Sequence, residues 1–157
     1  MITDLISLMK ALKEYFENDR YLSYIETVSI RKYEKGNLPE FDKYALIISP
    51  KKSIEELIAN RTKQDSFILD IVCIVRNFDS EKSLVGTGNG EQGIIILTKN
   101  VQKSLFDFGE ANSDELNILY DETENAIDFS IQKYPDRKDF FHEQIISYFV
   151  RLKHKIF

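Results

Sequence analysis

The sequence predicts an α+β fold: a mainly antiparallel sheet of about four to six strands, with two principal helices packed on one face. Strand-like runs cluster along the chain instead of alternating regularly with helices, and only two long segments show a helical period of apolar residues. The 157 residues are 43% hydrophobic and 30% charged, a balance typical of one globular domain. We therefore assign residues 1–157 to a single domain.

The first segment predicts an amphipathic helix. Thr3 is the expected N-cap, and Asp4 is well placed near the positive end of the helix dipole. The helix should fade between residues 18 and 22. Its apolar face consists of residues three or four positions apart: Leu5, Leu8, Met9, Leu12 and Phe16.

Three strand-like runs follow. The run "YIETVSIRKY" alternates like a half-buried strand, and "EKGNLPE" supplies turn residues. The next strand, "KYALIIS", is expected to end at Pro50, after which Ser53 and Glu56 would form a capping box for one helical turn. After "ANRTKQD", interpreted as a loop, "SFILDIVCIVRNF" is the strongest strand and an expected antiparallel neighbour.

The second half predicts one more helix and two or three strands. The helix, "GIIILTKNVQKSLFDF", should stop at Gly109, and its buried face is Ile94, Leu97, Val101 and Leu105. Short strands are expected in "LNILY" and in "NAIDFSIQ", where Ile127, Phe129 and Ile131 alternate. The last run, "DFFHEQIISYFVRLKHKIF", fits both a strand and a helix. The strand is favoured because Ile, Tyr, Phe and Val dominate its centre.

The stretch "GTGNGEQG" contains the spacing G-x-G-x-x-G from Gly88 to Gly93. A dinucleotide fingerprint needs its first glycine directly after a strand, whereas about ten mostly polar residues follow Asn77 here. Glu91 would also repel a pyrophosphate. The stretch is better interpreted as a mobile loop followed by a helix cap made by Asn89 and Gln92.

Other candidate chemical groups are few. Cys73 is the only cysteine of the sequence, which excludes an intrachain disulfide, and its place within an apolar run indicates a buried thiol. His142 and His154 have no partner ligand at helical spacing, and His142 beside Glu143 is interpreted as surface polarity. The acids Glu110, Asp114, Glu115, Asp121, Glu122 and Glu124 match no calcium loop and are interpreted as a solvated surface. We expect no catalytic residue, no metal site and no cofactor, and hence no enzyme.

Charge and hydropathy limit the partners. The formal net charge of -5 argues against a dedicated nucleic-acid-binding protein, because phosphate contacts need clustered Lys and Arg. No run approaches the roughly 20 apolar residues of a membrane span, and the start of the chain lacks a signal-peptide pattern. We expect no membrane association.

The order of elements resembles the tail terminator, or tail completion, proteins of tailed bacteriophages and phage-tail-like particles. The resemblance runs through "FDKYALIISPKKSIEE", "FILDIVCIVRN" and "GIIILTKNVQKSLFD", and its most specific part is the tyrosine-led strand "YALIISP". It implies an α+β structural protein that forms a ring, typically of six subunits. Such a ring ends polymerisation of the tail tube at its head-proximal end and joins the head or neck. The implied partners are further copies of the chain, the tail tube protein and the neck connector. DNA would only pass through the lumen, and the protein would reside in the virion tail after assembly in the host cytoplasm.

Subunit contacts of such a ring are expected at the C-terminal segment "SYFVRL", which is apolar on both faces. The expected interface residues are Tyr148, Phe149, Arg151 and Leu152. Residues 51–66 and 78–90 are expected to be mobile loops that order on docking. The alternative is a small cytosolic acidic binding module, similar to an immunity protein or antitoxin, that blocks a basic partner. A metal-dependent hydrolase built on the acids between Glu110 and Glu124 is a third hypothesis.

Overall fold

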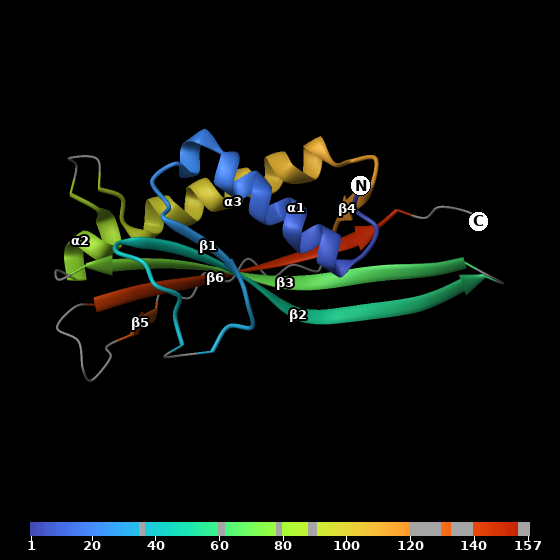
Figure 1. Ribbon diagram of the computed structural model, residues 1–157, viewed down its shortest axis with the longest axis horizontal. Coiled ribbons are helices and arrows are strands. Elements are labelled where there is room, and N and C mark those ends of the chain that lie inside the picture. The colour runs from blue at the N-terminus through green and yellow to red at the C-terminus, as the bar shows by residue number, and fades with distance from the viewer. Residues whose placement is uncertain are drawn as a thin grey trace.

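A computed structural model describes residues 1–34, 37–59, 62–77, 80–87, 91–119, 130–132 and 140–153 (Figure 1). Within these ranges, six strands form one sheet in the order β1-β2-β3-β6-β4, and β5 also pairs with β6. Only β1 and β2 run parallel; the other pairs are antiparallel. The predicted α+β fold is thereby confirmed. The strands are β1 (Thr27–Ile30), β2 (Tyr44–Ala59), β3 (Thr62–Asn77), β4 (Leu116–Ile118), β5 (Ser130–Gln132) and β6 (Phe140–Leu152).

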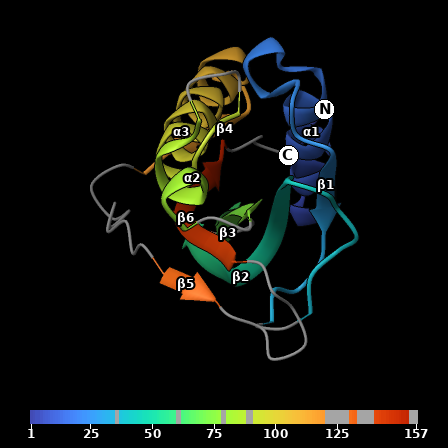
Figure 2. The same ribbon diagram turned by 90° about the vertical axis from the view of Figure 1, so that its left-hand side faces the viewer.

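Two long helices, α1 (Leu5–Asn18) and α3 (Ile94–Ala111), lie on the same face of the sheet. Viewed from one end in Figure 2, both helices lie above the curved sheet. Two shorter helices, the 3-10 helix η1 (Arg20–Leu22) and α2 (Ser80–Val85), connect the layers. This arrangement matches the expected packing of two helices on one face.

The main core lies between this helix layer and the sheet. The predicted apolar stripes face it: Leu8, Leu12 and Phe16 of α1 are buried, as are Ile94, Leu97, Val101 and Leu105 of α3. Alternate residues of the central strands complete the core, because successive side chains of a strand point to opposite faces. They include Phe67, Leu69, Ile71, Cys73 and Val75 of β3 and Ile146, Tyr148 and Val150 of β6.

The N-terminal cap of α1 is Asp4, one residue after the predicted Thr3. The Asp4 carboxylate accepts the Ser7 backbone N–H at 2.8 Å, and the Ser7 hydroxyl accepts the Asp4 N–H at 3.0 Å. This reciprocal pair satisfies two donors that an isolated helix start leaves unpaired. The hydrogen bonds from Ser7 lower the pKa of the Asp4 carboxyl.

The prediction that Pro50 ends the second strand was wrong. Strand β2 continues through Pro50 to Ala59, and the Ser53/Glu56 capping box and its helical turn do not exist. Two features of the sheet allow a proline within β2. The register with β3 is shifted between Pro50 and Lys52, and the pairing of β2 with β1 ends at Ile48. A proline is tolerated at a bulge on an edge because no ladder hydrogen bond is lost there.

Most of the predicted loop at 51–66 is therefore a two-stranded ribbon. Ser53 pairs with Phe67 and Leu57 with Lys63, so β3 begins at Thr62, several residues before the predicted start. The run "ANRTKQD" was interpreted as a loop because charged and amide side chains dominate it. Residues 60 and 61 lie outside the described ranges.

The face opposite the helices is partly covered by the connection from β1 to β2. Parallel neighbours need a crossover, and this one, which has no helix in its described residues, passes below the sheet in Figure 1. Its side chains Tyr33, Leu38 and Phe41 pack on a second cluster formed by Ala45, Ile47, Val72 and Ile74. This cover explains why the central strands are apolar on both faces.

The remaining elements follow the sequence with shifts at their ends. Helix α3 passes the predicted stop at Gly109 and ends at Ala111. Gly109 lies against β4, where an added Cβ would be 1.9 Å from the end of the Ile118 side chain, Cδ1. Strand β1 is shorter than the run that predicted it. Strands β4 and β5 occupy parts of "LNILY" and "NAIDFSIQ", and Ile127 and Phe129 lie outside the described residues. The favoured strand at the C-terminal end is confirmed by β6.

Candidate functional site

The candidate site is a projecting hairpin, which we call the arm: residues 51–59 of β2 and 62–66 of β3. The ladder with β1 ends at Ile48, and the ladder with β6 ends at Ser66, so beyond the pair Ile54–Ser66 the arm continues as two strands alone. Figure 1 shows the two strands extending together beyond the helices and β6. Two-stranded ribbons are marginally stable alone in water, and their edges offer unpaired backbone groups. The arm is therefore suited to contact another protein chain.

The far end of the arm exposes two large aliphatic side chains. Leu57 is 84% exposed and Ile58 is 54% exposed, and they adjoin each other in the sequence. Neither packs on the core of its own chain. Large apolar side chains left exposed at the end of a projection are candidates for contact with another protein.

The described residues of the arm include three lysines and three acidic residues. Lys63 and Glu55 form an ion pair across the ribbon, and both side chains are about half exposed. Such exposed pairs contribute little to stability, typically about 0–1 kcal/mol. The charges are Lys51, Lys52 and Lys63 against Glu55, Glu56 and Asp65.

The sequence placed the subunit contacts elsewhere, at Tyr148, Phe149, Arg151 and Leu152. Strand β6 lies inside the sheet, between β3 on one side and β4 and β5 on the other. Tyr148 is 5% and Phe149 is 6% exposed. Arg151 donates to the Ser66 hydroxyl at 3.2 Å, and Leu152 packs against the core. The segment is apolar on both faces because it is an inner strand, so its side chains give no support to a subunit contact there.

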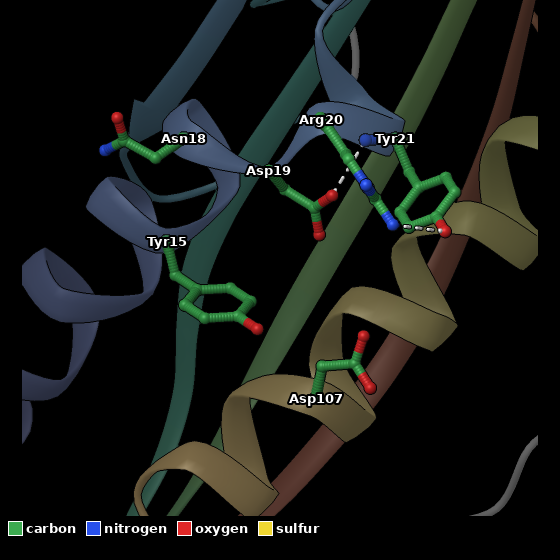
Figure 3. Close-up of a pocket in the computed structure, with 6 residues that line it drawn as sticks. All are labelled: Tyr15, Asn18, Asp19, Arg20, Tyr21 and Asp107. Atoms are coloured by element: carbon green, nitrogen blue, oxygen red, sulfur yellow. Dashed lines mark hydrogen bonds between the residues drawn. The ribbon is translucent and has the colours of Figure 1, made fainter.

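A pocket of about 330 Å³ lies between the end of α1, η1 and α3 (Figure 3). Tyr15, Asp19 and Asp107 point into a common space, and Asn18, Arg20 and Tyr21 complete the lining. Asp19 is held in place by accepting the Tyr21 backbone N–H at 2.8 Å. Burial, followed by the carboxylates of Asp107 and Asp19, raises the pKa of Tyr15, which keeps its hydroxyl protonated.

Two cations lie beside Tyr21 of this pocket. Arg20 donates to the Tyr21 hydroxyl at 3.1 Å, and Lys103 lies 4.0 Å from the ring centre of Tyr21. These cations lower the pKa of Tyr21, and within the described pocket lining no hydrogen bond joins its hydroxyl to the carboxylates of Asp19 or Asp107. In the described ranges, no three His, Cys, Asp or Glu side chains are grouped to hold a metal ion.

The predicted cap of the second long helix, made by Asn89 and Gln92, was wrong. Helix α3 starts at Ile94 with Gly93 as its N-cap, which makes no side-chain cap hydrogen bond. The Gln92 N–H donates to the Tyr44 hydroxyl at 2.8 Å, and Glu91 pairs with Lys43, so both residues are anchored to the sheet. The predicted loop 78–90 contains α2, while residues 78–79 and 88–90, with Asn89, lie outside the described ranges.

The titratable side chains buried in the described part of the chain pack in the interior of the protein. Cys73 is fully buried, and burial raises the pKa of its thiol to about 12, so it is no activated thiolate. His142 and Glu143 are each only 2% exposed, which corrects their interpretation as surface polarity. The Tyr33 hydroxyl donates to Glu143, and the Thr98 hydroxyl contacts the Gln144 side chain. Sequence reasoning missed both pairs because their members lie far apart along the chain.

The acidic cluster is only partly described. Of its members, Glu110 and Asp114 are exposed, and the Glu115 carboxylate accepts the Ile2 N–H at 2.5 Å. Asp121, Glu122, Glu124 and His154 lie outside the described residues. The three described acids therefore include one that ties the N-terminus to the turn before β4.

No protein-family model matches the chain, and no curated protein matches it. None of the described helices is long and apolar enough to cross a membrane.

Proposed function

We propose that this protein is a ring-forming tail terminator of a bacteriophage or phage-like tail. In this role it caps the head-proximal end of the tail tube, ends tube polymerisation and offers the surface that joins the head or neck. Its partners are other copies of the chain, the tube protein and the neck connector, and DNA only passes through the lumen. The protein is assembled in the host cytoplasm and resides in the virion tail.

The observation that carries this proposal is the arm. A structural subunit that docks on a polymer end needs backbone edges and apolar side chains displayed outside its own core. The arm provides both: open edges from residue 51 onward and the exposed pair Leu57 and Ile58. The α+β element order, with both long helices on one face, agrees with the fold that the resemblance implies.

The net charge of -5 suits a ring whose lumen lets DNA slide without binding. The proposed assignment also requires no catalytic constellation. The protein would act through surfaces instead of through chemistry.

The test uses purified chain and tail tubes lacking a terminator, viewed by negative-stain electron microscopy with a labelled chain. We expect label at one tube end and an end to tube growth. The variant Leu57→Lys/Ile58→Lys should lose this end binding, whereas Phe106→Lys, which changes a 51% exposed side chain on α3, should retain it. A chain that never associates with tube ends would refute the proposal.

The alternative function, an acidic module that blocks a basic partner, is separated from this one by affinity capture from cognate cells. Tube or neck subunits would support the terminator. A single basic protein bound in a 1:1 complex, with no tube subunit, would support the alternative.

A further inference from the structure

The outer edge of β2 in the arm is an unpaired strand edge. The parallel ladder with β1 ends at the pair Ile30–Ile48, and β3 occupies only the other side of β2. From Ser49 to Ala59, no described strand pairs with this outer edge. Such an edge is a template for another strand unless charge or shape prevents pairing.

The charges along this edge follow a directional order. The sequence "KKSIEE", Lys51 to Glu56, begins with two cations and ends with two anions. Lys52, Ile54 and Glu56 share one face of the ribbon, since their partners on β3 are Ile68, Ser66 and Gln64 in regular register. Lys52 and Glu56 are exposed, and Ile54 is half-buried.

Lys52 and Glu56 form no ion pair within the described part of the chain. Four residues of a strand separate their Cα atoms by roughly 13 Å, so they cannot pair with each other. A second strand running antiparallel, however, would bring a glutamate opposite the lysine and a lysine opposite the glutamate.

We propose that the arms of two copies of this chain pair antiparallel along the outer β2 edge, around a two-fold axis at Ile54. Lys52 then lies opposite Glu56 of the second copy, and the same contact recurs on the other side of the axis. Between the two charge pairs, Ile54 faces its own copy. Opposite charges and β-branched pairs directly across a ladder are both stabilising.

Other registers of the same edge are less favourable. In an antiparallel pair, residues directly opposite point to the same face, so the residue on a two-fold axis must face itself. An axis at Lys52 would oppose lysine to lysine, and an axis at Glu55 would oppose glutamate to glutamate. An axis at Ser53 would place Lys51 opposite Glu55, but Lys51 lies at the register shift between Pro50 and Lys52, and Lys52 would lie opposite Ile54. Parallel in-register pairing would oppose every charge to its like.

The occupant of the edge is a second copy because the edge is complementary to itself. The contact is isologous and closes at two chains, whereas a ring needs a heterologous contact. The dimer is therefore a form of the free chain, and it does not depend on the proposed role in a tail. It would also hide a strand edge that is otherwise open to aggregation.

Charge reversal tests the pairing by light scattering coupled to size-exclusion chromatography and by sedimentation. We expect a concentration-dependent dimer of the unaltered chain. Lys52→Glu alone or Glu56→Lys alone should raise the dimer dissociation constant by roughly tenfold or more, since each reverses both symmetric contacts. The double variant Lys52→Glu/Glu56→Lys should recover the dimer. An equimolar mixture of the two single variants should form a heterodimer.

The matched control is Lys99→Glu, the same charge change at an exposed position on α3. It should leave the dissociation constant unchanged. A strict monomer at all concentrations would overturn the proposal, as would a dimer insensitive to both arm variants. A double variant that fails to recover would overturn it as well.

Cysteine cross-linking tests the register. Across an antiparallel ladder the Cα atoms of an axial residue lie about 5 Å apart, within reach of a disulfide. Ile54→Cys should therefore cross-link into a dimer on mild oxidation. In Leu57→Cys, the two new thiols would lie roughly 20 Å apart and should not cross-link, although Leu57 is 84% exposed. Equal or faster cross-linking at Leu57 would overturn the register. Cys73 is buried and does not compete.

Discussion

Replacing Gly93 with alanine tests how the glycine stretch is packed. An ideal Cβ on Gly93 would lie 2.3 Å from the Leu84 carbonyl oxygen, 2.5 Å from its carbon and 2.6 Å from the Gly86 nitrogen. All three are backbone atoms, so no side-chain rotation can relieve the contact. The φ of Gly93 is -91°, which any residue adopts. Close approach of the backbone of residues 84–86, and not backbone freedom, therefore requires glycine here.

Two contributions determine how far Gly93→Ala should lower the free energy of unfolding. Overpacking a tightly packed position costs about 1–3 kcal/mol. A clash of the new Cβ with backbone atoms lies at the upper end of that range, because the backbone cannot rotate away. Alanine is also a poor N-cap compared with glycine, which adds about 1 kcal/mol for α3. We expect Gly93→Ala to lower the free energy of unfolding by about 3–4 kcal/mol. For a domain of this size, that corresponds to a fall in Tm of roughly 10 °C.

The assay is urea denaturation followed by circular dichroism, with thermal unfolding as a second measurement. Gly109→Ala is the matched control. Its Cβ would meet the Cδ1 end of the Ile118 side chain at 1.9 Å, a group that can rotate away. Alanine also gains about 1 kcal/mol in a helix interior, so a net change within about 1 kcal/mol is expected. A Gly93→Ala loss no larger than that of Gly109→Ala would refute the packing argument.

Three further predictions concern the core. Phe108→Ala should lower the free energy of unfolding by about 3–5 kcal/mol, because Phe108 is 1% exposed and packs edge-on against Tyr15 at 5.5 Å. Phe106→Ala, on the exposed face of the same helix, should change it by about 0.5 kcal/mol at most in urea denaturation. Cys73 should not react with a disulfide reagent at pH 8 without denaturant, since its pKa is raised to about 12, and should react once the chain is unfolded; fast reaction in the folded state would contradict this. Burial lowers the pKa of His142 below its ordinary 6.5, so the unfolded chain takes up the proton first and stability should fall as pH drops through 6.5. His142→Gln should flatten this dependence between pH 7 and 5, and parallel stability curves for both chains would contradict it.

The fold class and the principal helices follow from the sequence because periodicity is a local property. The apolar positions of α1 recur every three or four residues and all face one layer. The strand at the C-terminal end was likewise predicted from its β-branched and aromatic centre. The helix ends were less predictable. The cap of α1 was predicted at Thr3, and the structure has it at Asp4. The side chain that reaches the Ser7 N–H is selected by backbone geometry within one turn.

The arm was the main feature that local reasoning missed. Pro50 and the polar run after it indicated a break and a loop, but β3 continues alongside them and holds Lys52 to Leu57 in a ladder. Pairing between strands supplies hydrogen bonds that residue propensity does not record. The burial of Tyr148 and Phe149 was missed for a related reason. Whether a strand lies at an edge or inside a sheet depends on which distant segments pair with it.

By itself, then, the sequence determined the α+β class, the two helices with their buried faces and the buried thiol of Cys73, because each depends on neighbours within a few residues. The charge order Lys51 to Glu56 is also present in the sequence alone. Only the tertiary structure decided that this run lies on an open strand edge, beyond the end of β1. It also decided that Gly93 sits against the backbone of Leu84, a close approach set by the packing of α2 and α3.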